Sequence, residues 1–376
     1  MKLCVFPNDP LESYLKKGEI KPRYFNPKNL FDEIHVISLF DSDVEEDKVK
    51  IVAGNANFKI HVVGKVNLLN KNKMKQKIIN LIKEIKPDVI RSYNPLLQGW
   101  IAANVKKELN IPLVISLHGN YDLDLRYQAK VNRDYKSFLR LQITKQILEK
   151  FALRNADQII IVYEFIRNYA KKLGGKNINL IYNRIDLSKF SPNVTPKIIE
   201  EKPIIICVGR LMKEKNQECL IYAIKDLDVI LLLIGDGPQY SDLKNLVEKL
   251  NLKHKVRFER VISNDEINGY YTSADIFAQP TNYGGFSIPV LEAAASGIPV
   301  ILPKQNFKSQ PEIVEKFAML VDNTAESFQF AIKEILSNEL LKSKMQKEGI
   351  ETTKKIRGDL MEEKEKELYL KVISKY

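Results

Sequence analysis

Several features are scarce in this sequence of 376 residues, and each scarcity excludes a class of protein. It contains three cysteines, Cys4, Cys207 and Cys219, and none of them stands in a C-x-x-C spacing. An odd count without paired spacing argues against a disulfide framework or a zinc site. No apolar run approaches the roughly 18 residues that a membrane-spanning helix needs. We therefore expect a globular protein without a bound metal, a disulfide or a membrane span.

The N-terminus also lacks the pattern of a signal peptide. Met1 to Phe6 forms a short strand-like run, and Asn8-Asp9-Pro10 breaks it at once. A secretory signal would need a longer apolar region after a basic start. The expected location is therefore the cytoplasm.

What is abundant is positive charge, and it is concentrated in one half. Residues 1–190 hold 33 Lys and Arg against 20 Asp and Glu, a net charge of +13, whereas residues 191–376 hold 26 against 27. Such asymmetry favours an anionic partner for the first half, such as a membrane surface, a lipid-phosphate acceptor or a nucleic acid. A merely solvated, lysine-rich surface is the alternative.

Apolar runs with strand character alternate with helical patterns along the chain, which predicts parallel sheets with helices on both faces. Lys71–Ile85 and Leu96–Leu109 have helical spacing. The expected strands of the first half are Asp32–Ser38, Phe58–Val63, Asp88–Arg91, Leu113–Leu117, Gln158–Val162 and Asn179–Tyr182. Those of the second half are Ile204–Val208, Val229–Ile234, Lys255–Phe258, Ile276–Ala278, Val300–Leu302 and Met319–Val321.

A polar segment with Pro192 and Pro196 separates the two series and reads as a linker. We expect one domain over residues 1–190, a second over 191–350, and a charged helical tail over 351–376 that packs back on the body. Two doubly wound sheets bind ligands at the carboxyl ends of their strands, so a cleft between the domains is the expected site.

The strongest motif is a glycine loop at 283–286 followed by a helix start. Ser287 suits the N-cap, Pro289 the first turn and Gly297 the stop. The backbone N–H groups of Ser287, Ile288 and Val290 would then be available to a phosphate. Glu292 follows one turn later, near where a ribose would offer its hydroxyls. The alternative is a glycine-stopped helix whose Glu292 is solvated.

Three further motifs follow apolar strands. Gly209-Arg210 ends one strand, and Lys215 follows five residues after Arg210, so both cations could reach a diphosphate. Gly235-Asp236-Gly237-Pro238 forms a tight turn that would let a ligand approach the backbone, although a structural turn explains it as well. His118-Gly119 ends a strand of the first half, where the imidazole would face a cleft or serve structurally.

Taken in order, these motifs resemble the family-4 group of retaining glycosyltransferases (glycosyl transferases group 1). The resemblance covers nearly the whole chain. It rests on His118-Gly119, Ala156-Asp157-Gln158, Ile181 to Asp186, Phe190-Ser191-Pro192, Gly209-Arg210-Leu211 with Lys215, Gly235 to Pro238, Ala274-Asp275-Ile276 and the stretch from Tyr283 to Val300. It implies the α/β GT-B fold, in which two Rossmann-like doubly wound domains face a central cleft.

The resemblance also implies roles for single residues. Arg210 and Lys215 would neutralise the donor diphosphate, Glu292 would hold the ribose, and His118 would lie beside the transferred sugar. Such enzymes are usually metal-independent and need no cofactor besides the nucleotide-sugar co-substrate. The expected donor-binding residues are Gly209, Gly235, Gly284, Gly285, Phe286, Ser287, Ile288 and Glu292, and the expected catalytic residues are His118, Arg210 and Lys215.

The sequence departs from the family pattern at three places. Gly284 stands where the family usually has a Glu, eight residues before Glu292, that touches the donor sugar. The loop between Pro7 and Gly18 has one glycine where the family tends to be glycine-rich, and Arg184 replaces a usual glycine.

The leading hypothesis is sugar transfer from a nucleotide-diphosphate donor to a glycan or lipid-linked acceptor with retention, at the inner face of a membrane. A nucleotide-sugar epimerase would need carboxylates near His118, for which Asp122 and Asp124 are candidates. A non-catalytic GT-B subunit is favoured by Gly284 and opposed by Arg210, Lys215 and Glu292. Nucleic-acid binding has only the charge in its favour, because no zinc or helix-turn-helix signature accompanies it.

Overall fold

The computed structural model describes residues 1–16, 18, 20–260, 262–263, 265–282, 287–305 and 311–376. The chain divides into two compact units: unit 1 comprises Met1–Tyr182 with Asp359–Tyr376, and unit 2 comprises Asn183–Gly358. The predicted boundary stood at 190/191. The chain therefore enters unit 2 once and returns to unit 1 with its last helix.

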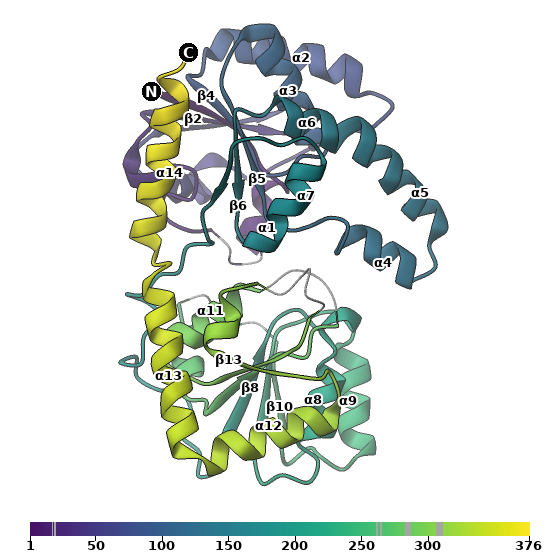
Figure 1. Ribbon diagram of the computed structural model, residues 1–376, viewed down its shortest axis with the longest axis vertical. Coiled ribbons are helices and arrows are strands. Elements are labelled where there is room, and N and C mark those ends of the chain that lie inside the picture. The colour runs from purple at the N-terminus through teal and green to yellow at the C-terminus, as the bar shows by residue number, and fades with distance from the viewer. Residues whose placement is uncertain (17, 19, 261, 264, 283–286, 306–310) are drawn as a thin grey trace. The chain divides into compact units, whose positions relative to one another are not determined.

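Unit 1 is built on a seven-stranded sheet in which every paired strand is parallel (Figure 1). The strands are β1 (Lys2–Phe6), β2 (Glu33–Ser38), β3 (Asn57–Val62), β4 (Val89–Ser92), β5 (Leu113–Leu117), β6 (Gln158–Ile161) and β7 (Ile178–Leu180). Their spatial order is β3-β2-β1-β4-β5-β6-β7. The order reverses direction between β1 and β4, which makes the carboxyl ends of these two strands the switch point where such sheets bind ligands.

The helices of unit 1 cover this sheet. They are α1 (Leu11–Lys16), α2 (Lys71–Ile85), α3 (Leu97–Leu109), α4 (Leu125–Val131), α5 (Tyr135–Thr144), α6 (Lys150–Asn155), α7 (Arg167–Lys172) and α14 (Gly358–Ile373). Shorter turns are η1 (Pro27–Asn29), η2 (Glu46–Lys48), η3 (Lys50–Ala53), η5 (Glu164–Ile166) and the π-helical turn η4 (Lys145–Glu149). The predicted helices over Lys71–Ile85 and Leu96–Leu109 correspond to α2 and α3.

Unit 2 repeats the design with six parallel strands in the order β10-β9-β8-β11-β12-β13. The strands are β8 (Ile204–Val208), β9 (Ile230–Ile234), β10 (Val256–Glu259), β11 (Ile276–Ala278), β12 (Val300–Pro303) and β13 (Ala318–Val321). The helices are α8 (Gln217–Ala223), α9 (Tyr240–Lys249), α10 (Ile267–Thr272), α11 (Ile288–Ala295), α12 (Ala325–Ser337) and α13 (Glu339–Lys354), with the short turns η6 (Lys213–Lys215) and η7 (Val314–Lys316). The switch point of this sheet lies between β8 and β11.

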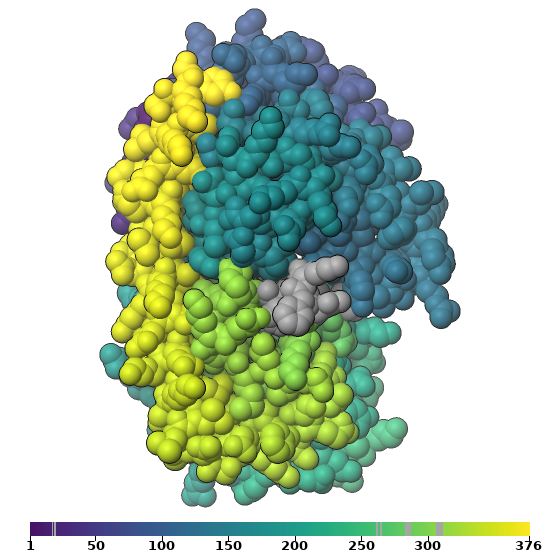
Figure 2. All heavy atoms as spheres, viewed as in Figure 1, coloured from purple at the N-terminus to yellow at the C-terminus, as the bar shows by residue number. Residues whose placement is uncertain are grey.

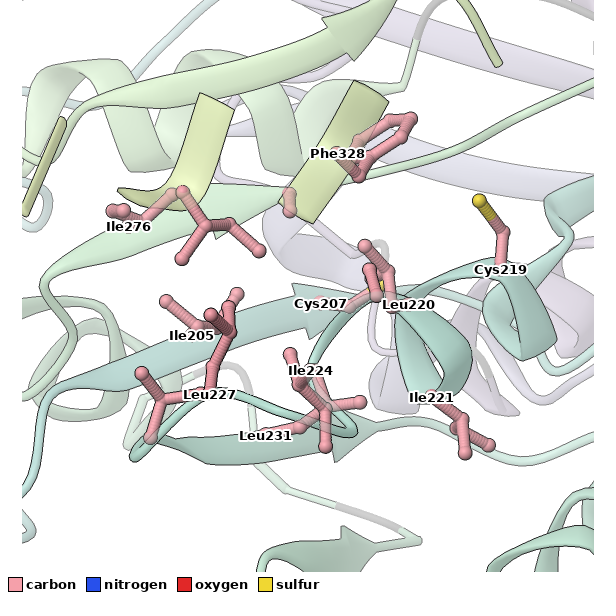
Figure 3. Packing of buried hydrophobic residues seen from close by; sticks show 14 of the residues in the cluster. Ile205, Cys207, Cys219, Leu220, Ile221, Ile224, Leu227, Leu231, Ile276 and Phe328 are labelled. Carbon is pink, nitrogen blue, oxygen red and sulfur yellow. The ribbon is translucent and has the colours of Figure 1, made fainter. Parts of the chain in front are cut away.

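The core of unit 2 shows why the apolar runs form central strands. Ile205 and Leu231 are fully buried, and helices pack over them through Leu220, Ile224 and Phe328, all with no exposed surface (Figure 3). Strands buried on both faces read as continuous Ile, Leu and Val runs, which is the pattern found at 204–208 and 230–234. Cys207 and Cys219 belong to this core as small apolar side chains.

The final helix belongs to the core of unit 1. In Figure 1, α14 (yellow) runs alongside the unit 1 sheet, and its side chains Met361 and Tyr369 are fully buried there. The Tyr369 ring meets Phe31 edge-on, with ring centroids 5.1 Å apart. The helix α14 thus completes the core of unit 1, whose other elements all come from residues 1–182.

Candidate active site

Two glycine turns interlock at the carboxyl ends of β8 and β9. The Gly209 N–H donates to the Ile234 carbonyl at 2.9 Å, and the Leu211 N–H donates to the Asp236 carbonyl at 2.9 Å. Gly235 has φ +141°, and a Cβ there would lie 2.1 Å from the Gly209 carbonyl oxygen. Only glycine allows this approach and this backbone angle. For the turn at Gly235 to Pro238, the sequence allowed either ligand binding or a purely structural role. In the structure, this turn fixes the loop that carries Arg210.

Arg210 stands exposed on this fixed loop. Its carbonyl accepts a hydrogen bond at 3.0 Å from the amide of Gln217, a buried residue at the start of α8. Lys215 ends the turn η6 and is half-buried. Lys215 lies in the segment between β8 and α8. Burial raises the pKa of the Cys207 thiol to about 12, and the Lys215 charge acts in the opposite direction. Both predicted diphosphate cations therefore lie at the β8 end of the switch point.

Gln279, which sequence reasoning missed, joins the two sides of this switch point. It directly follows β11 and is 4% exposed. Its side-chain amide donates to the Val208 carbonyl at 3.0 Å, and its side-chain oxygen accepts from the Ser287 hydroxyl at 2.6 Å. The end of β8 is thereby tied to the start of α11. The signal in the sequence was a polar residue directly after a short buried strand. That signal alone does not show that β11 lies next to β8, which is what places Gln279 at the switch point.

Ser287 occupies the N-cap position of α11, with Pro289 in the first turn, as predicted. Its hydroxyl bonds to Gln279 instead of capping the helix. The expectation that the Val290 N–H is available was wrong, because that group donates to the Ser287 carbonyl at 3.2 Å. Ile288 begins the helix. Gly284, Gly285 and Phe286, the remaining predicted donor-binding residues, lie outside the described residues.

Glu292 is 9% exposed, so the alternative of a solvated side chain is wrong. The hydroxyl of Tyr271, a fully buried residue of α10, donates to Glu292 Oε2 at 2.9 Å. Burial and the Glu292 charge raise the pKa of Tyr271 well above its ordinary value, which keeps the hydroxyl protonated as a donor. The carboxylate is thus oriented from within the core of unit 2.

His118 belongs to unit 1, where it follows β5. Its imidazole is accessible to solvent and stacks on Tyr93, with ring centroids 5.7 Å apart and planes 9° from parallel. Desolvation by the surrounding protein, together with the charge of Arg91, lowers the pKa of His118 below its ordinary value. The imidazole is neutral at pH 7.

A buried network supports this stacked pair from behind. The Arg91 guanidinium lies 4.5 Å from the Tyr93 ring centroid, pairs with Glu365 and donates to the Tyr369 hydroxyl at 2.8 Å. Arg91 and Glu365 are each 5% exposed. Glu365 and Tyr369 come from α14, so the last helix of the chain helps to hold the ring beneath His118. Sequence reasoning missed this network because its members are far apart in the chain.

Asp122 and Asp124, the carboxylates that an epimerase could use near His118, each accept hydrogen bonds from another side chain. Both Asp122 oxygens accept from the Lys145 ammonium, at 2.7 and 2.6 Å. Asp124 accepts from the Gln128 amide at 2.8 Å. A proton carrier in that reaction needs a carboxylate directed at the substrate. Within the described parts of the chain, no three His, Cys, Asp or Glu side chains converge as metal ligands would.

Known proteins with similar sequences identify the family. The family model described as Glycosyl transferases group 1 matches residues 193–352, and the model described as Glycosyltransferase Family 4 matches residues 30–189. Together they account for most of both units. The chain belongs to this group of glycosyltransferases, and it is an enzyme of that class.

Relatives with names agree with this assignment. The chain is 26% identical over 333 residues to an uncharacterised glycosyltransferase of Methanocaldococcus jannaschii, covering 86% of this chain and 85% of the relative. It is 26% identical over 242 residues to the alpha-monoglucosyldiacylglycerol synthase of Streptococcus pneumoniae, covering 60% of this chain and 54% of the synthase. The matches thus span most of the archaeal protein but about half of the length of several others.

Solved structures share the fold. Sucrose-phosphate synthase from Thermosynechococcus elongatus superposes with a TM-score of 0.75 at 18% identity, over 100% of both chains. Anabaena HepE in complex with UDP superposes with a TM-score of 0.77 at 16% identity, over 99% of this chain and 100% of that chain. The predicted α/β fold class of two Rossmann-like parallel-sheet domains, GT-B, is confirmed.

Proposed function

We propose that this enzyme transfers a sugar from a nucleotide-diphosphate donor to a glycan or lipid-linked acceptor, with retention of the anomeric configuration. One observation carries the donor assignment. The interlocked turns at Gly209 and Gly235 hold Arg210 on a fixed loop at the switch point of unit 2, and Lys215 ends the short turn η6 that follows. A structural neighbour, HepE, is described in complex with UDP-glucose, which supports a nucleotide-sugar donor.

In the proposed reaction, the bond between the anomeric carbon and the diphosphate oxygen breaks. An acceptor hydroxyl oxygen bonds to that carbon and gives its proton to the departing diphosphate oxygen. Negative charge grows on the leaving diphosphate. Arg210 would bind it through its planar fork and Lys215 as a point charge, without a metal ion. Glu292, held by Tyr271, would accept hydrogen bonds from the ribose hydroxyls.

His118 would lie beside the transferred sugar as a neutral imidazole. A neutral ring at pH 7 can donate one hydrogen bond to a sugar hydroxyl and adds no positive charge next to the developing cation at the anomeric carbon. The stacked Tyr93 ring and the buried Arg91 behind it would fix the orientation of the imidazole.

The acceptor and the location of the enzyme remain predictions. Relatives are named for lipid acceptors, such as diacylglycerol and diphosphoundecaprenol derivatives. These names support a lipid-linked acceptor, and we propose that the enzyme reaches it from the cytoplasmic face of a membrane. Among the residues that the structure describes, no helix is both long and apolar enough to cross a bilayer.

A calorimetric screen with UDP, GDP, ADP and their sugars tests the donor site and identifies the base. Arg210→Ala and Lys215→Ala should each lower turnover by roughly 10²–10³, about 3–4 kcal/mol of transition-state stabilisation. Lys213→Ala is the matched control, because Lys213 is exposed in the same short turn. Near-normal turnover in both site variants would remove the diphosphate assignment. Donor binding without any transfer would favour the non-catalytic subunit.

A further inference from the structure

A row of apolar side chains lies exposed on one helical hairpin of unit 1. The hairpin runs through α4, α5 and η4. The exposed side chains, each between 45% and 69% accessible, are Tyr127, Val131, Tyr135, Leu139, Ile143 and Ile147. Successive members are four residues apart, so within a helix they share one face. We call these six residues the apolar row. Figure 2 shows that the blue segment of unit 1 containing α4 and α5 forms part of the outer surface.

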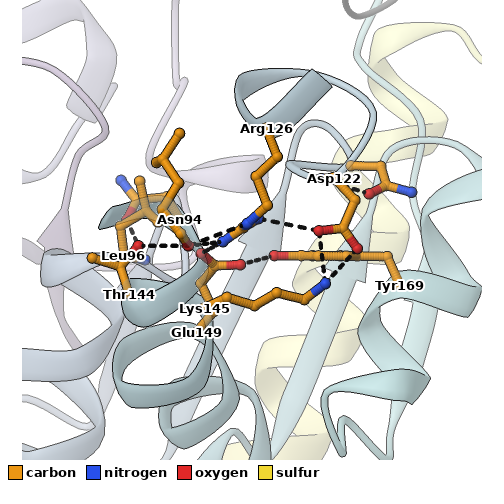
Figure 4. Close-up of polar contacts among 10 residues, drawn as sticks. Asn94, Leu96, Asp122, Arg126, Thr144, Lys145, Glu149 and Tyr169 are labelled. Atoms are coloured by element: carbon orange, nitrogen blue, oxygen red, sulfur yellow. Dashed lines mark hydrogen bonds and ion pairs between the residues drawn. The ribbon is translucent and has the colours of Figure 1, made fainter. Parts of the chain in front are cut away.

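The hairpin does not need this row in order to fold, because other groups hold it. The buried Arg126 of α4 donates to the Leu141 carbonyl of α5 at 2.8 Å and pairs with the fully buried Glu149 of η4 (Figure 4). Glu149 also accepts from the Tyr169 hydroxyl. Ala129 and Leu148 supply buried apolar contacts. Every member of the apolar row is at least 45% exposed, so burial within the hairpin does not explain its composition.

Positive charge borders the row. The exposed cations of the hairpin are Lys130, Arg133, Lys136 and Arg140. Lys136 and Arg140 each follow a member of the row by one residue, which places them about 100° around the helix, at the edge of the apolar face. Asp134 is the one acidic residue between 127 and 147, and its carboxylate accepts from the Ser137 N–H as the cap of α5. Arg133 lies in the turn between α4 and α5, with φ +55°.

We propose that the apolar row is a docking surface for an anionic lipid bilayer, with the bordering cations at the lipid phosphates. An apolar face edged by Lys and Arg is the composition of helices that lie in the bilayer interface. A second copy of the chain would bring like charges together, which disfavours pairing through this face. This inference goes beyond the transfer reaction and does not depend on it.

The lysines of α2, at positions 71, 73, 75 and 77, fit this role less well. The Lys71 and Lys75 ammonium groups lie 5.2 and 5.8 Å from the Trp100 ring centroid. Lys77 donates to the Val63 carbonyl at 3.1 Å. Residues two apart also point to different sides of a helix. These lysines add to the net charge, whereas the hairpin combines charge with exposed apolar surface.

Co-sedimentation of the full-length protein with vesicles tests the proposal. The wild-type protein should bind vesicles of phosphatidylcholine mixed with phosphatidylglycerol at low salt, and bind pure phosphatidylcholine at least about tenfold more weakly. Leu139→Ser with Ile143→Ser should reduce binding to the anionic vesicles at least about tenfold. Lys136→Gln with Arg140→Gln should reduce binding at low salt and flatten its salt dependence.

The matched control is Phe330→Ser with Leu340→Ser, which removes two exposed apolar side chains from α12 and α13 of unit 2. This control should bind like the wild type. Calorimetry with the nucleotide separates this surface from the donor site, because the variants in the apolar row should keep their nucleotide affinity and thermal unfolding. Wild-type binding by the Leu139→Ser, Ile143→Ser variant, or no binding to anionic vesicles by any form, would overturn the proposal. A wild-type dimer that this variant converts to a monomer in ultracentrifugation would instead show a surface between copies.

Discussion

At the scale of single residues, the proposed donor site depends on close backbone approach. A Cβ at position 235 would lie 2.1 Å from the Gly209 carbonyl oxygen, so this approach requires glycine at Gly235. Arg210 is therefore held by main-chain hydrogen bonds on a loop with little freedom, which is the pre-organisation that a charge-stabilising cation needs. The role of a glycine here is to position a neighbouring residue.

Gly235→Ala should unfold unit 2 more easily and weaken nucleotide binding. The new Cβ would overlap the Gly209 carbonyl oxygen, 2.1 Å away, at a backbone angle that L-residues rarely adopt. Such strain costs about 1–3 kcal/mol. Urea denaturation measures it. Gly119→Ala is the control for stability, because a Cβ there meets nothing within 4 Å. Equal stability of the two variants would contradict the interlocked arrangement.

Glu292→Gln should weaken the binding of a nucleoside diphosphate but leave the binding of inorganic diphosphate unchanged, because a carboxylate accepts from ribose hydroxyls better than an amide does. Tyr271→Phe should have a smaller effect in the same direction and destabilise unit 2 by about 1–3 kcal/mol, since it removes the hydroxyl that satisfies a buried carboxylate. Arg210→Ala should weaken both ligands. Calorimetry with the two ligands distinguishes the roles, and an unchanged nucleoside affinity in Glu292→Gln would place the ribose elsewhere.

A histidine pair at the edge of unit 1 should make stability depend on pH. His35 Nδ1 and His61 Nε2 lie 3.0 Å apart, so one ring must be neutral to accept the hydrogen bond. Desolvation lowers the pKa of both rings. Glu33 acts in the opposite direction on His35, and Glu46 does so on His61. An unfolded histidine titrates near 6.5. Below that pH the unfolded chain binds more protons, so stability should be full above about pH 6.5 and fall as the pH decreases.

The measurement is the urea midpoint between neutral and mildly acid pH. His61→Gln should reduce the loss, because it removes one of the two rings that must be protonated. A midpoint in the wild type that rises toward acid pH would contradict the assignment.

At the scale of elements, α14 links the end of the chain to the centre of unit 1. Its residue Glu365 pairs with the buried Arg91 of β4, next to the Tyr93 ring on which His118 stacks. A C-terminal helix thus contributes to the support of His118, a candidate catalytic residue that follows β5. This support explains why α14 carries a buried acid within a charged segment.

Glu365→Gln should destabilise unit 1 by about 3–5 kcal/mol, because it leaves the Arg91 charge buried without its partner. Glu363→Gln makes the same substitution two residues earlier on α14. Glu363 pairs with Lys366 at 2.9 Å on the surface, where such a pair contributes about 0–1 kcal/mol. Chemical denaturation compares the two variants. If both lose the same small amount, the buried pair does not stabilise unit 1.

At the scale of the whole molecule, the excess positive charge belongs to unit 1 and the proposed donor site to unit 2. Unit 1 carries 35 Lys and Arg against 24 Asp and Glu, and unit 2 carries 24 against 23. The donor diphosphate cannot account for the excess, because its proposed cations Arg210 and Lys215 belong to unit 2. The excess instead lies in the unit that carries the apolar row, as expected if unit 1 meets an anionic surface.

Nucleoside diphosphate should therefore stabilise unit 2 first. At a hundredfold excess over its Kd, a ligand that binds only the folded state adds about 2.7 kcal/mol. Hydrogen exchange should slow in β8 and β11 and stay unchanged in β3, at the far edge of the unit 1 sheet. Equal slowing in β3 and β8 would show that the nucleotide does not act through unit 2.

The sequence by itself determined the two sheets, the motif positions and the family. Apolar runs such as 204–208 and 230–234 predict buried strands because their period and composition are local properties, and glycine after a strand marks a turn for the same reason. It also contained the four-residue spacing of the apolar row, but not its exposure. Only the tertiary structure decided that Gln279 joins β8 to α11, that Tyr271 holds Glu292, and that Glu365 pairs with Arg91. These contacts join residues distant in the chain, and no local pattern encodes which strand ends and helices will meet.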